Sequence, residues 1–73
     1  MNDIIETLNR YVNNKIPTGG FLHAVLSNDL MGACAKADNI NRHRLVEISS
    51  YIYNNLPMDS WGSPEIVSKW LES

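Results

Sequence analysis

Two glycines directly before an apolar run form a turn in this sequence that could bind an anion. Gly19, Gly20 and Phe21 lie in the stretch KIPTGGFLHAVLSNDL, residues 15–30. Because glycine lets backbone N–H groups approach an anion at the start of a helix, this turn could cradle a phosphate. The structural alternative is that the glycines allow a tight turn and close helix packing. Taken alone, the pattern favours this alternative.

Four further polar residues could complete a site for a phosphate-bearing ligand. Asn28 and Asp29 follow the apolar run, and Arg42 and Arg44 come from a short basic stretch further along the chain. Guanidinium groups bind phosphate oxygens through charge-assisted hydrogen bonds, while amide and carboxylate groups can bind ribose hydroxyls. Asp29 also has a structural interpretation, since aspartate is favoured at the start of a helix.

Tyr53 and Trp61 are the aromatic residues most able to contact a ligand or a partner. A tyrosine or tryptophan ring can stack on a nucleobase while its polar tip stays hydrated. Trp61 is the preferred contact residue, because it stands beside a glycine in the connector MDSWG. The alternative is that these rings complete the core or a subunit interface.

The sequence contains no recognisable catalytic or metal-binding motif. It has no GxSxG nucleophile turn and no GxxxxGK[ST] phosphate loop, and His23 and His43 lack the i, i+4 spacing of a helical zinc pair. Cys34 is the only cysteine, so no intrachain disulfide can form, and we expect it to be buried and inert in an alanine-rich helix. We therefore expect a protein that is not an enzyme and needs no metal or cofactor.

Length and charge restrict the class of protein and its partners. The chain has 73 residues, 44% of them apolar, and a formal net charge of −2. This length predicts one domain over residues 1–73, with a small core that gains from self-association, so we expect a homo-oligomer. The acidic charge disfavours DNA as a partner. No apolar stretch approaches the roughly 20 residues that span a bilayer, and the acidic N-terminus is unlike a signal peptide, so we expect a cytoplasmic protein without a membrane partner.

Apolar residues at helical spacing predict an all-α fold, a compact bundle of four to five short helices. Prolines and short polar stretches separate the predicted helices. These cover residues 3–14, a helix that begins at Gly19 and Gly20, a break or kink at 27–29, a small-residue helix over 30–37, the longest helix from Asp38 or Asn39 to Leu56, and a terminal helix after Ser63.

Capping residues and apolar stripes refine this prediction. The side chains expected to cap the successive helices are those of Asn2 or Asp3, Thr18, Ser27 or Asn28, Asp38 or Asn39, and Ser63. In the longest helix, Leu45, Ile48, Ile52 and Leu56 form the predicted core stripe, and Val46 and Tyr53 are expected to widen it. The buried face of the terminal helix is predicted to contain Ile66, Val67, Trp70 and Leu71.

The chain resembles a set of small, largely uncharacterised proteins of bacteriophages and bacterial mobile elements. The likeness covers about residues 10–72 and rests on IPTGGFLHAVLSNDL, the following AxxAD, the YNNLP turn and the terminal WGSPE...WLE. These motifs are specific as a combination, although each is short. The resemblance implies a phage-associated all-helical protein in the host bacterial cytoplasm. Compact phage proteins of this kind are often counter-defence factors, and no catalytic residue carries over.

Two hypotheses for the function follow from the residues and the resemblance. The first is that a homo-oligomer sequesters a nucleotide-derived immune signalling molecule in a pocket, with phosphates and ribose bound by the polar residues and the base stacked on Tyr53 or Trp61. The alternative is a protein-binding inhibitor or adaptor that docks on a host protein, such as a defence protein, through an apolar helix face and Trp61.

Overall fold

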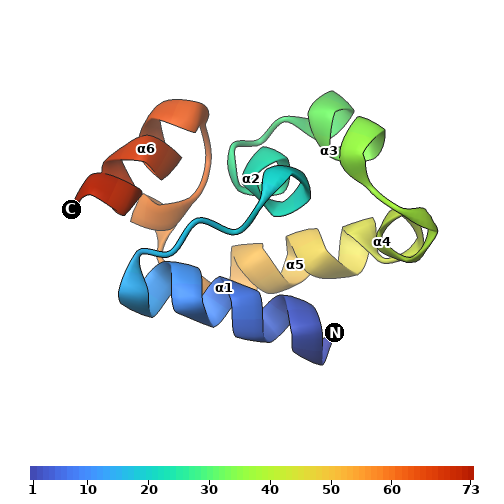
Figure 1. The fold of residues 1–73 in the computed structure, drawn as a ribbon, viewed down its shortest axis with the longest axis horizontal. Coiled ribbons are helices and arrows are strands. Elements are labelled where there is room, and N and C mark those ends of the chain that lie inside the picture. Colours follow the sequence, from blue (N-terminus) through green and yellow to red (C-terminus); the bar gives the residue numbers. More distant parts are fainter.

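The computed structural model describes residues 1–73, which form six α-helices and one 3₁₀ turn without any strand (Figure 1). The predicted all-α class is confirmed. The number of helices exceeds the predicted four to five because a five-residue helix separates from its neighbour. The elements are α1 (Asn2–Asn14), α2 (Gly20–Leu26), α3 (Leu30–Lys36), α4 (Asn39–His43), α5 (Leu45–Asn55), η1 (Met58–Ser60) and α6 (Pro64–Glu72).

The core lies where α1, α2, α5 and α6 meet. Tyr11 is its largest fully buried side chain, and its hydroxyl donates to the carbonyl of Ser60 over 2.7 Å. Trp70 of α6 donates from Nε1 to the carbonyl of Tyr11 over 3.3 Å, which ties both ends of the chain together. The buried core residues are Ile4, Leu8, Tyr11, Leu22, Leu26, Ile48, Ile52, Leu56 and Val67.

The terminal helix starts and packs largely as the sequence predicts. Ser63 caps α6 through its hydroxyl, which accepts from the Ile66 N–H over 3.2 Å, and Pro64 occupies the first turn. Val67 is fully buried. The other predicted core residues of this helix, Ile66, Trp70 and Leu71, are only half-buried.

Three predicted helix caps are wrong, and two of them belong to α1 and α2. α1 begins at Asn2 without a side-chain cap, and the carboxylate of Asp3 bonds to Arg44 instead. The N-cap of α2 is Gly19, not Thr18, and the Thr18 hydroxyl contacts the Gly19 carbonyl at 3.3 Å. The reason is conformational: Gly19 has a φ of 98°, a left-handed value that glycine adopts without strain, so the helix starts one residue later.

The turn between α2 and α3 is held by its own backbone and side-chain hydrogen bonds. Asn28 adopts a φ of 62°, which asparagine tolerates better than most residues. The Asp29 N–H donates to the Ala24 carbonyl over 2.8 Å, which closes the end of α2. Asp29 itself caps α3, since its carboxylate accepts from the Gly32 N–H over 3.0 Å. The expected cap at Ser27 or Asn28 is therefore wrong, although the helix break there is confirmed.

The predicted longest helix is interrupted at Arg44. Asp38 caps α4 as expected, with its carboxylate accepting from the Asn41 N–H over 2.7 Å. α4 ends after five residues, because Arg44 leaves helical geometry and its side chain turns back to Asp3 and Asn41. At 13 residues, α1 is the longest helix instead.

Three residues expected in the interior are exposed. Val46 and Tyr53 were predicted to widen the core stripe of α5, but they are 80% and 72% exposed. They lie on a neighbouring face, because the core contacts only the face that carries Ile48 and Ile52. Cys34 is also exposed rather than buried, since α3 turns only Ala33 inward.

Candidate functional site

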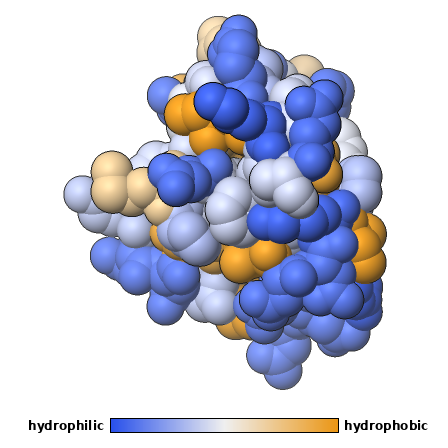
Figure 2. Space-filling view, turned by 90° about the vertical axis from the view of Figure 1, so that its left-hand side faces the viewer, coloured by the Kyte–Doolittle hydropathy of each residue, from blue (hydrophilic) through white to orange (hydrophobic).

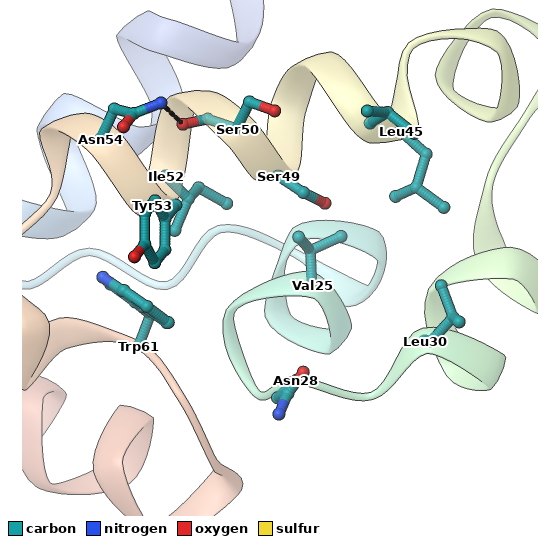
Figure 3. Close-up of a pocket in the computed structure, with 11 residues that line it drawn as sticks. Val25, Asn28, Leu30, Leu45, Ser49, Ser50, Ile52, Tyr53, Asn54 and Trp61 are labelled. Atoms are coloured by element: carbon teal, nitrogen blue, oxygen red, sulfur yellow. Dashed lines mark hydrogen bonds between the residues drawn. The ribbon is translucent and has the colours of Figure 1, made fainter.

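The most apolar hollow of the molecule is a groove of about 450 Å³ between α5 and the α2–α3 turn, with Trp61 at one end (Figure 3). α5 forms one wall, and Val25 and Leu30 face it from α2 and α3. The lining residues are Val25, Asn28, Leu30, Leu45, Val46, Ser49, Ser50, Ile52, Tyr53, Asn54 and Trp61. Its size lies in the range of small-molecule sites, and it is open along its length.

Tyr53 and Trp61 form an aromatic pair at one end of the groove. Their ring centroids lie 5.8 Å apart with the planes tilted by 56°, within the range that favours aromatic contact. The Trp61 indole N–H is directed to the Leu56 carbonyl at 3.4 Å, and the ring is half-buried. Trp61 is thus held by the fold, while Tyr53 is free to contact a partner.

The groove contains no ionised side chain. Its polar lining consists of the side chains of Asn28, Ser49, Ser50 and Asn54 with the Tyr53 hydroxyl. Asn54 donates from Nδ2 to the Ser50 carbonyl over 2.9 Å, a bond within α5 that uses part of this polarity (Figure 3). A neutral, largely apolar groove favours neutral apolar surfaces, and it offers no cation to a phosphate.

A second hollow, of about 300 Å³, surrounds the Gly19–Gly20 turn. Its lining residues are Asp3, Ile4, Thr7, Thr18, Gly19, Gly20, Phe21, Leu22 and Asn41. Arg44 does not line this hollow, and its guanidinium binds the carboxylate of Asp3, a lining residue, with distances of 3.2 and 2.7 Å. This hydrogen bond from Arg44 lowers the pKa of Asp3, so the carboxylate stays ionised and repels an anion. Gly19 is explained here by its left-handed backbone.

The predicted ligand residues do not form one site. Tyr53, Trp61 and Asn28 line the groove, and Asp29 lines a small hollow that shares Asn28 and Leu30 with it. Gly19, Gly20 and Phe21 line the separate glycine hollow, and Arg44 lines neither hollow but binds Asp3. Arg42 is exposed and lines neither hollow.

Sequence reasoning missed most of the aliphatic and hydroxyl lining of the groove. Val46, Ser49, Ser50 and Tyr53 follow the spacing i, i+3, i+4, i+7 and form a second stripe on α5 beside the buried one. This spacing was visible in the sequence, but Val46 and Tyr53 were assigned to the core. Leu30, at 62% exposure, gave no such signal because it starts a short helix.

One other face of the surface can be compared with the groove. On the face at the α6 end of the molecule, hydrophobic patches are small and separated by hydrophilic side chains (Figure 2). No group of three or more His, Cys, Asp or Glu side chains gathers where it could hold a metal ion. None of the helices has the length and apolar character required to cross a bilayer.

Comparison with known proteins adds no identification. No protein-family model, curated protein or solved structure matches the chain.

Proposed function

We propose that this chain is a binding protein that docks on another protein through the aromatic groove. The observation that carries the proposal is the combination of a neutral groove with large exposed side chains along it: Leu30, Val46 and Tyr53 are 62%, 80% and 72% exposed. Exposed aromatic and aliphatic side chains around a partly buried tryptophan are typical of the central part of a protein interface.

The partner surface that fits this groove is apolar and uncharged at its centre. A charged partner side chain would lose its hydration there without meeting an opposite charge. An amphipathic helix that presents two or three aliphatic or aromatic residues satisfies this condition. The resemblance to small phage proteins supports a host defence protein as the source of that surface, bound without catalysis in the host bacterial cytoplasm.

The test is affinity purification from a bacterial host with matched surface variants. The expected result is one host protein recovered in stoichiometric amount, with binding lost in Tyr53→Ala and Leu30→Asp. Met58→Asp is the matched control, because Met58 is 80% exposed and lies outside the groove. Circular dichroism of each variant verifies the fold. Equal recovery of the partner with all variants would contradict the proposal.

A nucleotide-sequestering protein is the second candidate function. It is favoured by the Tyr53–Trp61 pair and the Asn28 amide, which together could hold a planar base in a hollow of about 450 Å³. Because no cationic side chain lines the groove, the phosphates would have to remain outside it. Calorimetric titration with cyclic dinucleotides and ADP-ribose derivatives tests this candidate. Saturable heat that disappears in Tyr53→Ala would support it, and no heat with any of these ligands would exclude it.

A further inference from the structure

The outer stripe of α5 has the pattern of a surface that fits a copy of itself. Val46 and Tyr53 stand at its two ends, and Ser49 and Ser50 lie between them. All four are exposed, and the contact of the Tyr53 ring with Trp61 leaves most of the stripe uncovered within the chain. Small residues at its centre let a second helix approach to the usual interaxial distance of roughly 8–10 Å, while the larger ends remain free to interdigitate.

The positions of these four residues are symmetric along the helix. Val46 and Tyr53 are equally far from the point between Ser49 and Ser50. If two copies of α5 cross antiparallel with a twofold axis at that point, Val46 of each copy meets the partner's Tyr53. Such a reciprocal arrangement is what a twofold interface requires, because one patch must complement itself.

The charges of α5 favour the same arrangement. Near a twofold axis every ionised group lies close to its own copy, and like charges so placed repel. Glu47 is the only ionised side chain of α5, and it does not line the groove. An antiparallel crossing also places the C-terminus of each helix beside the N-terminus of the other, which is the favourable orientation of the helix dipoles.

We infer that in the free protein the groove is occupied by α5 of a second copy, in a twofold dimer centred between Ser49 and Ser50. This inference rests on the proposed function, since it takes the groove to be a protein-docking site and names the first partner to occupy it. A typical stable interface needs about 800 Å² per partner, about a sixth of the 4674 Å² surface of this chain. Because α5 is only about 16 Å long, Leu30 and Trp61 at the groove must contribute to that area.

The dimer has a consequence for binding to a host protein. Both partners compete for Tyr53 and Val46, so the host protein must displace the second copy. The apparent affinity for the host protein therefore falls as the concentration of this chain rises above the dimer dissociation constant.

Sedimentation equilibrium over a concentration series tests the dimer directly. We expect the wild type to change from monomer to dimer, and we expect Val46→Asp to weaken the dimer at least about tenfold because it places a carboxylate without a counter-charge against the partner's Tyr53. Met58→Asp introduces the same charge at a position that is also 80% exposed, and it should leave the dimer unchanged. A wild type that stays monomeric at all concentrations, or equal weakening by both variants, would overturn the inference.

Cysteine cross-linking tests the position of the axis. Cys34 is exposed, so all cross-linking variants carry Cys34→Ser. Under mild oxidation Ser50→Cys should form an intermolecular disulfide rapidly, because residues next to the axis face their own copies. Asn54→Cys, about 6 Å further along α5, should cross-link much more slowly, since this position and its copy lie far apart on opposite sides of the axis. Equal rates at both positions would contradict the proposed axis.

The two proposals fail in different ways. A monomeric wild type that still captures a host protein through Tyr53 would remove the dimer and leave the proposed function. A dimer that cross-links at Ser50→Cys but captures no host protein would remove the proposed function and leave the dimer.

Discussion

The two halves of this small molecule are built by different means. The core half consists of α1, α2, α5 and α6, whose nine clustered apolar side chains are all buried. The segment α3–α4 contributes no residue to that cluster: α3 buries only Ala33, and α4 buries none of its residues. This segment instead exposes Leu30, Met31 and Ile40 at 62%, 78% and 68%.

The difference separates the helices that carry the stability of the chain from a segment that adds little to it. Burial of large apolar side chains is the main source of folding free energy, so the core half carries most of the stability of the chain. The segment α3–α4 is held by caps at Asp29 and Asp38 and by packing of small residues against α2. It can therefore expose large apolar side chains without supporting the fold, and of these Leu30 lines the groove opposite α5. Four predictions test this division.

The largest expected effect is on a core residue of α1. Leu8 is fully buried, and Leu8→Ala should lower the free energy of unfolding by about 2–5 kcal/mol, because it leaves a cavity among packed side chains. Met31→Ala, at a position 78% exposed in α3, should change it by less than about 0.5 kcal/mol. Urea denaturation of both variants measures the contrast. Comparable losses would show that α3 supports the core.

The buried tyrosine provides a second test of the core half. Tyr11→Phe removes the hydroxyl that donates to the Ser60 carbonyl and leaves that buried acceptor without its partner. We expect a loss of about 1–3 kcal/mol in the free energy of unfolding. Tyr53→Phe is the matched control, since Tyr53 is 72% exposed, and it should be nearly neutral in the same denaturation experiment. A neutral Tyr11→Phe would mean that this hydrogen bond adds nothing to the core.

The sequence was sufficient to predict the core half because that half follows helical periodicity. The spacing places Leu8 and Tyr11 on one face of α1, and Ile48 and Ile52 on one face of α5. The pair Ser63-Pro64 predicts the start of α6 from local capping preferences alone. Such signals depend on residues close in sequence. The fold class and most helix bounds could therefore be derived without tertiary information.

The site could not be predicted in the same way because it depends on contacts between distant residues. Arg44, at the junction of α4 and α5, pairs with Asp3, 41 positions away, a contact that local sequence patterns do not signal. Periodicity alone could not distinguish the buried stripe of α5 from the outer stripe beside it. The assignment of Val46 and Tyr53 to the core was wrong for that reason.

Alkaline titration tests how much the burial of the Tyr11 hydroxyl contributes to stability. Burial raises the pKa of Tyr11 from its ordinary value of 10.0 to about 12. Between these two values the unfolded chain releases the phenolic proton and the folded chain retains it, so the stabilising contribution is complete below pH 10 and is lost as the pH rises towards 12. The free energy of unfolding should fall by about 1.4 kcal/mol per pH unit in this window, on top of the titration of other groups. Tyr11→Phe should lack this component when both proteins are unfolded in urea at pH 9 to 12.

The smallest expected effect concerns the link between the two halves. Arg44 lies where α4 meets α5, and its two hydrogen bonds to the Asp3 carboxylate join this junction to the start of α1. Asp3→Asn should lower the stability only slightly, because Asp3 is exposed and exposed ion pairs contribute little. The pKa of Asp3 is lowered by Arg44, so the contribution of the pair is present at neutral pH and is lost as the pH falls below the ordinary value of 3.8.

The informative measurement for Asp3→Asn is local rather than global. If the pair holds α4 against the core half, amide hydrogen exchange should become faster in α4 and stay unchanged around Tyr11 and Ile48. Added salt should reproduce part of this change in the wild type, because it screens the exposed pair. Faster exchange throughout the core would show instead that the two halves unfold together, and the division between a stabilising core half and a segment that adds little stability would then be wrong.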